Sequence, residues 1–195
     1  DAASNTNRIK VFMTDYRRTR IGGASYFFTV NLLNRRSRPL LDHLDLVKTV
    51  MGKVLANHPY RIDAIAVLPD HMHCIWTLPE GDADYATRWM LIKSGISRRL
   101  PRTEEVSFSR SKRRERGIWQ RRYWEHLVRD DADMRNHIDY IHWNPVKHGW
   151  VDRVRDWPYS SFHRFVECGI YPLDWGDAPV SNIETGERQK NRRMC

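Results

Sequence analysis

Two short apolar runs, residues 62–68 and 71–78, are separated only by Pro69 and Asp70. Both runs are rich in β-branched and aromatic residues, which favour strands, and Pro-Asp is a typical turn sequence. Segments this close together pair most simply as antiparallel strands joined by a tight turn. The chain therefore contains a β-hairpin, and the remaining segments have to build a sheet around it.

Further strands and helices follow from residue periodicity. Residues 26–32 follow the turn-forming pair Gly22-Gly23 and predict a first strand, and residues 118–128 predict a fourth. Apolar residues recur at intervals of three and four between Leu41 and Leu55, which predicts a helix ending near His58 and Pro59. The same spacing predicts a second helix over residues 84–100.

A third predicted helix covers residues 131–146 and contains Pro145. Proline has no backbone N–H and clashes with the preceding turn, so we expect this helix to be short and to end or distort at about Asn144. The resulting order, β-α-β-β-α-β-α, predicts an α+β fold of the ferredoxin-like type, with an antiparallel sheet and two helices on one face.

The length of 195 residues fits one domain with tails. We expect a polar, basic N-terminal arm at residues 1–20, a main domain at 21–150, and a flexible tail at 176–195. Residues 102–117 lack apolar periodicity and predict a basic loop within the main domain. Residues 151–175 are too aromatic for a solvated linker, so we expect them to pack on the core.

The composition indicates an anionic partner. Lys and Arg number 33 against 24 Asp and Glu, a net charge of +9, and such an excess favours polyanions because neutralised phosphates release counterions. The basic residues of the arm and the basic loop that could contact such a polyanion are Arg17, Arg18, Arg20, Arg110, Lys112, Arg113 and Arg114.

The apolar runs are too short to span a bilayer, and residues 1–20 lack the apolar stretch of a secretory signal, which predicts a cytoplasmic protein with no membrane partner. Cys74, Cys168 and Cys195 form no compact disulfide framework, so we expect reduced thiols.

The most informative segment is His71-Met72-His73. Alternate strand residues point to one face, so both imidazoles project together and can bind one divalent metal. A metal-free pair of histidines is the alternative interpretation of this motif alone. Open positions for phosphate oxygens and water favour Mg²⁺ or Mn²⁺, and the absence of cysteine at ligand spacing disfavours zinc.

Tyr140 and Asn144 are four residues apart and share one helix face. A tyrosine there can attack a phosphodiester and form a phosphotyrosine, although tyrosines in helices are more often structural. Lys147 follows Pro145 and is a further candidate for contacting phosphate. His126, His137, His142 and His148 are interpreted as structural histidines.

Four stretches, LPDHMHCIWTLPEGD, IWQRRYWEH, HIDYIHWNPVKHGWV and WPYSSFHR, are similar in order and spacing to those of the REP-associated tyrosine transposases. The resemblance implies a catalytic domain of the HUH type at residues 21–150, named for two histidines that flank a hydrophobic residue. His71 and His73 would be this metal-binding pair. It also implies Tyr140 as the nucleophile and Asn144 as the third metal-facing residue. Related insertion-sequence transposases have glutamine where Asn144 stands.

The resemblance further implies cleavage of single-stranded DNA beside a REP hairpin, leaving a 5′ phosphate on Tyr140 and a free 3′ hydroxyl. Two alternatives stay open: a catalytically inactive hairpin-binding regulatory protein, and a metal-dependent nuclease that uses water. The short turn at Asp130-Asp131 favours a site built within a monomer, with a dimer as the alternative.

Overall fold

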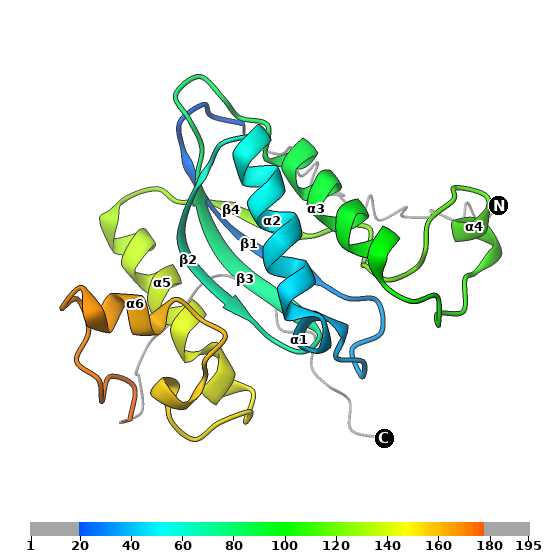
Figure 1. Cartoon of the computed structure of the whole chain (residues 1–195). Coiled ribbons are helices and arrows are strands. Elements are labelled where there is room, and N and C mark those ends of the chain that lie inside the picture. Colours follow the sequence, from blue (N-terminus) through cyan, green and yellow to red (C-terminus); the bar gives the residue numbers. More distant parts are fainter. Residues whose placement is uncertain (1–19, 178–195) are drawn as a thin grey trace, which may run out of the picture.

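Residues 20–177 are described by the computed structural model, and they build a four-stranded antiparallel sheet flanked by helices on both faces (Figure 1). The strand order is β2-β3-β1-β4, as expected for the ferredoxin-like arrangement. The strands are β1 (Ser25–Asn31), β2 (Arg61–Val67), β3 (His71–Thr77) and β4 (Trp124–Leu127). The predicted α+β fold and the β2–β3 hairpin are therefore confirmed.

The main helices are α1 (Pro39–Asp42), α2 (Leu44–Asn57), α3 (Tyr85–Arg99) and α5 (Asp131–Lys147). Shorter helical segments are α4 (Phe108–Ser111), η1 (Val154–Asp156) and α6 (Phe162–Glu167). None of the helices between residues 20 and 177 is both long and apolar enough to cross a membrane. The free thiols of Cys74 and Cys168 are buried and exposed, respectively.

Strand alternation divides the core between the two faces of the sheet. Tyr26 and Phe28 of β1 pack in the larger cluster with α2 and α3, as the prediction of two helices on one face requires. Phe27, between them, packs in a second cluster with Tyr140 and Ile141 of α5. Helix α5 therefore covers the opposite face of the sheet, and the side chains of α5 face those of the sheet there.

The fourth strand is shorter than predicted. Continuing the register of β4 from Thr29↔Trp124 would place Arg121 opposite Leu32, whereas Trp119 makes that bridge. The excess residues between Trp119 and Trp124 must bulge from the sheet. The prediction of a continuous strand over residues 118–128 is wrong for this reason.

Helix α5 is longer than predicted, because Pro145 lies inside it and does not end it. A proline in the last turn removes only its own N–H from the backbone ladder. The amides that follow find acceptors, His148 N donating to Asn144 O and Trp150 N to Pro145 O, both at 3.0 Å. The predicted range of 131–146 is nearly right, but the expectation that the helix is short and ends at about Asn144 is wrong.

The segment after α5 lies along the outer edge of β2. Val67 N donates to Tyr159 O, and Ser161 N donates to Ile65 O, both at 2.8 Å. The indole Nε1 of Trp157 donates to Val67 O at 3.2 Å. These bonds satisfy backbone groups that an edge strand would otherwise present to solvent. The proposed division of the chain at residue 150 stays a prediction.

Candidate active site

Two histidines of β3 face α5. His71 and His73 alternate with Met72 and Cys74, which belong to the core on the other face. Their ring centroids are 4.8 Å apart and the rings are nearly perpendicular. Both are almost completely buried, at 3% and 1% exposure. The structure thus brings the predicted pair together on one face.

Each histidine uses one ring nitrogen for a hydrogen bond within the protein. Nδ1 of His73 lies 2.9 Å from Oγ1 of Thr29, its cross-strand partner in β1. Nδ1 of His71 lies 2.7 Å from Oδ1 of Asp70. This pattern, in which Nδ1–H donates to an oxygen, orients a histidine so that Nε2 can bind a metal.

Asp70 is held ionised between two partners. Burial alone would raise the pKa of Asp70, but hydrogen bonds from His71 and Arg35 outweigh it and lower that pKa to about 2. The Arg35 Nε–H donates to Oδ2 of the same carboxylate. Sequence reasoning did not identify Asp70, Arg35 or Thr29, because their roles depend on contacts that the linear motif does not contain.

Burial and the neighbouring His71 hold the pKa of His73 well below its usual range. The imidazole is therefore neutral, the form that binds metals. Within the described part of the chain, Nε2 of His73 is buried and has no hydrogen-bond partner. An unsatisfied buried nitrogen is costly, and a metal ligand position accounts for it.

Helix α5 brings Tyr140 to this site. Asp130 caps the helix, its side chain accepting a bond from Asp133 N at 2.8 Å. Nearly three turns after the cap, the ring of Tyr140 lies 5.2 Å from that of His73 and 6.0 Å from that of Phe27. The residue is only 4% exposed, so the phenol lies over the sheet face that carries the histidines.

Asn144 lies one turn beyond Tyr140 and is completely buried. Neither its amide oxygen nor its amide nitrogen has a hydrogen-bond partner among residues 20–177. The amide oxygen of Asn144 can therefore bind a divalent metal that also takes imidazole and water ligands. The donor set of His71, His73 and Asn144 thus fits a divalent metal.

Two further groups surround the site. The ammonium of Lys147 lies 4.5 Å from the centroid of the Tyr140 ring, so this lysine lies at the phenol and apart from the predicted basic loop. The ring of His148 lies 5.2 Å from that of His71. Partial burial and the neighbouring His71 lower the pKa of His148 to about 4.

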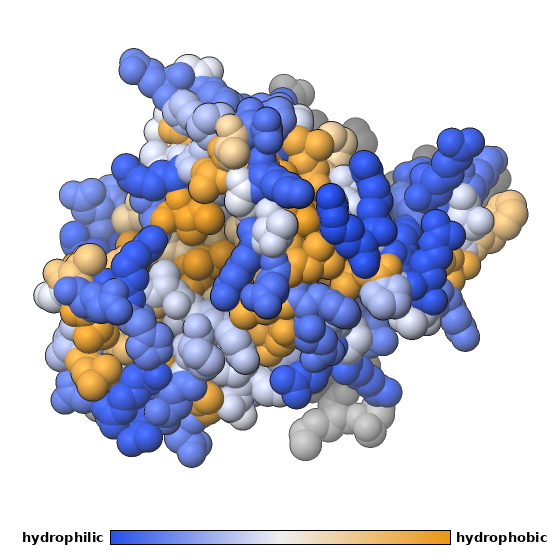
Figure 2. Space-filling model, in the orientation of Figure 1, coloured by the Kyte–Doolittle hydropathy of each residue, from blue (hydrophilic) through white to orange (hydrophobic). Residues whose placement is uncertain are grey.

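The predicted basic loop forms a separate surface beside α3. Arg110, Arg113 and Arg114 line a cavity of about 680 Å³ that also includes Trp119 and Tyr123. We call the basic loop and the residues that line this cavity the basic lobe. Figure 2 shows many hydrophilic side chains there, at the right of the view over α4. Lys112 is exposed on the same loop. This surface lies on the α3 side of the molecule, away from α5 (Figure 1).

The remaining candidate in the arm, Arg20, is exposed and lies near Asp84. Arg17 and Arg18, Cys195 and most of the predicted tail lie outside the described residues. His142 is a buried structural residue, its Nε2 lying 2.8 Å from Oγ of Ser161. His126 and His137 lie together with Asp133, where β4 meets α5.

Comparison with known proteins shows close relatives, although no protein-family model matches the chain. The REP-associated tyrosine transposase of Escherichia coli (strain K12) is 48% identical over 177 residues, which are 90% of this chain and 98% of the relative. A curated relative from Haemophilus influenzae is also 48% identical, over 173 residues that cover 88% and 98% of the two chains.

A solved structure, described as a REP-associated tyrosine transposase bound to a REP hairpin, superposes with a TM-score of 0.76 at 46% identity. The match covers 92% of this chain and all of the solved chain.

Proposed function

The chain belongs to the REP-associated tyrosine transposases, and on that premise we propose that it cleaves single-stranded DNA beside a REP hairpin through Tyr140. It is an enzyme of the transposase class that acts at REP hairpins. The observation that carries the residue assignment is the approach of the Tyr140 ring to His73, at 5.2 Å, over one sheet face.

In the proposed reaction, Oη of Tyr140 forms a bond to the scissile phosphorus while the bond from phosphorus to the 3′ oxygen breaks. The phenol loses its proton, and the departing 3′ oxygen gains one. The products are a 5′ phosphate on Tyr140 and a free 3′ hydroxyl. One phosphate ester replaces another, so the intermediate can pass the strand to a new 3′ hydroxyl.

His71, His73 and Asn144 would hold the divalent metal, and Mg²⁺ or Mn²⁺ suits this mixed set. The metal would supply polarisation of the scissile phosphate and partial neutralisation of its charge. The chain's own contribution is orientation: Thr29 and Asp70 direct the two imidazoles, and α5 sets the phenol above them.

Lys147 supports the same step. A cation 4.5 Å from the Tyr140 ring favours negative charge on the phenol as its proton leaves. This position also allows the contact with a DNA phosphate that the sequence suggested.

We propose that hairpin phosphates bind the basic lobe, where Arg110, Arg113 and Arg114 surround the cavity beside α3. Arginine favours phosphates because its planar head donates two parallel bonds. Lys112 extends the same surface, and Arg17, Arg18 and Arg20 are proposed contacts from the arm. Trp119 and Tyr123 add aromatic surface to the cavity.

The proposed active site is complete within one chain, because Tyr140 reaches His73 of the same chain. This favours action as a monomer.

The test is a denaturing gel after incubation with a single-stranded REP hairpin oligonucleotide and Mg²⁺ or Mn²⁺. We expect a covalent protein–DNA adduct from the wild type, none from Tyr140→Phe, and an unchanged adduct from the control Tyr159→Phe, whose ring is exposed. Cleavage that survives in Tyr140→Phe would favour a water-using nuclease. If the wild type binds the hairpin without cleaving it, the result would indicate the catalytically inactive, hairpin-binding regulatory protein.

A further inference from the structure

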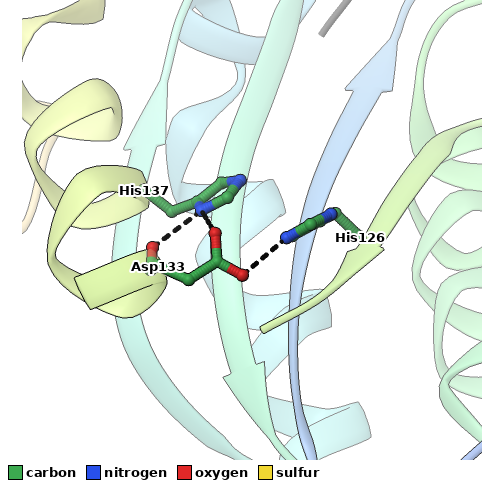
Figure 3. Close-up of side chains that lie close together, drawn as sticks. All are labelled: His126, Asp133 and His137. Carbon is green, nitrogen blue, oxygen red and sulfur yellow. Dashed lines mark hydrogen bonds and ion pairs between the residues drawn. The ribbon is translucent and has the colours of Figure 1, made fainter. Parts of the chain in front are cut away.

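Two histidines and an aspartate converge where α5 meets β4: His126, Asp133 and His137 (Figure 3). Nε2 of His126 lies 2.8 Å from Oδ2 of Asp133. Nδ1 of His137 lies 3.1 Å from Oδ1 of the same carboxylate and 2.8 Å from the backbone oxygen of Asp133. One potential ligand atom from each residue lies within 4.8 Å of the others. The carboxylate therefore stands between imidazoles from two separate elements.

These separations are those of hydrogen bonds, and they are slightly shorter than the separations between the ligands of a metal. Tetrahedral zinc binds nitrogen and oxygen at about 2.0–2.2 Å, which places neighbouring ligand atoms roughly 3.3 Å apart. The two nitrogen-to-oxygen separations of 2.8 and 3.1 Å need only a small expansion to admit the ion. Two histidines, one carboxylate and an open position for water form a common zinc ligand set.

The surrounding residues hold the two imidazoles in place. The ring of His126 stacks on Trp124, with 5.7 Å between centroids, and that of His137 packs 4.7 Å from Phe27. Asp133 and His137 are one turn apart on α5, so their side chains share a face. The ligand positions exist before any ion arrives, which lowers the cost of binding.

The cluster is also accessible from one side. Asp133 and His137 are 7% and 1% exposed, whereas the side chain of His126 is 23% exposed and offers a path for an ion. The backbone amide of Arg129 donates to Oδ2 of Asp133 at 3.0 Å and leaves Oδ1 of that carboxylate to the ion. The side chain of Arg129 also donates to Oδ2, but it is 72% exposed and can withdraw into solvent. Binding requires the ring hydrogens that face Asp133 to move to the other nitrogen of each imidazole, and it replaces the bond between Nδ1 of His137 and the Asp133 backbone oxygen.

We propose that His126, Asp133 and His137 bind one Zn²⁺ ion at a second metal site, separate from His71 and His73, that links α5 to β4. Two imidazoles and one carboxylate favour Zn²⁺ over Mg²⁺, which prefers oxygen ligands. The alternative is a clasp without metal, in which the carboxylate simply bridges two imidazoles.

The test measures metal binding by the whole chain and does not depend on cleavage. Equilibrium dialysis with Zn²⁺ should show that His126→Gln binds one equivalent less than the wild type. The control His43→Gln removes an exposed histidine at the start of α2 and should lose nothing. Equal zinc binding by the two variants would overturn the proposal, whether or not the protein cleaves DNA.

A cysteine variant covers the case in which His126→Gln fails to fold. His126→Cys places a thiolate, also a zinc ligand, at the same position. With Co²⁺ as a spectroscopic probe, this variant should give thiolate-to-metal absorption that Asp133→Asn in the same background weakens. A His126→Cys protein that is folded by circular dichroism and shows no such absorption would contradict the second site.

Discussion

The ring of Tyr140 lies edge-on to the imidazole of His73, with 74° between the ring planes. The two residues come from elements that face each other, α5 and β3, and Phe27 of β1 packs against both rings. Changes that disturb the orientation of His73 should therefore affect metal binding and cleavage together and should leave binding at the proposed hairpin surface beside α3 unchanged.

Thr29→Val tests this orientation directly. Valine has nearly the same shape but leaves Nδ1 of His73 without its partner at 2.9 Å. Loss of such a supporting bond typically costs about 10- to 100-fold in metal affinity, so we expect the Mn²⁺ concentration for half-maximal cleavage to rise by that factor. Thr29→Ser keeps the hydroxyl and should behave like the wild type. Equal metal dependence of the valine and serine variants would rule out the role of Thr29.

Lys147→Met separates two functions of one lysine. If the ammonium favours charge on Tyr140, as its distance of 4.5 Å suggests, cleavage at saturating hairpin should fall by about tenfold, which corresponds to about 1.4 kcal/mol. Lys147→Arg keeps the charge and should retain most of the rate. A weaker hairpin affinity with an unchanged single-turnover rate would instead assign Lys147 to DNA binding alone.

Local sequence signals account for most of the fold. The β2–β3 hairpin was predictable because its strands are adjacent, and α3 because its apolar residues recur every three or four positions. The two wrong predictions concern the length of β4 and the end of α5. The first depends on non-local pairing and the second on the exact position of a proline. The extent of β4 depends on pairing with β1, and Pro145 interrupts α5 too late to end it.

The same distinction applies to the candidate site. His71 and His73 were predictable because strand alternation alone places them on one face. Their partner Thr29 was not, since it comes from β1 and meets His73 only through the β1–β3 register. The cluster around Asp133 likewise requires β4 and α5 to be docked, so His126 looked like an ordinary structural histidine in the sequence.

Arg113→Ala tests the proposed hairpin surface. The side chain is exposed at the basic cavity, and each phosphate contact contributes about one unit to the slope of log affinity against log salt. We expect that slope to flatten by about one unit in a fluorescence anisotropy titration. Arg153→Ala, on the loop before η1, serves as the control because its guanidinium pairs with Asp156. Equal slopes for both variants would exclude Arg113 from the hairpin surface.

Acid should destabilise the fold partly through His142. Burial, and to a lesser extent the charge of Arg164, lowers the pKa of His142 to about 3, whereas an unfolded histidine has a pKa of about 6.5. The unfolded chain therefore takes up the proton first as pH falls. The stability that the neutral imidazole contributes is complete above about pH 6.5 and declines toward pH 3, by up to about 1.4 kcal/mol per pH unit. Urea unfolding of the wild type and His142→Gln between pH 7 and pH 4.5 measures this difference. The glutamine cannot take up a proton, so its stability should fall less steeply, and parallel curves would show that His142 does not contribute.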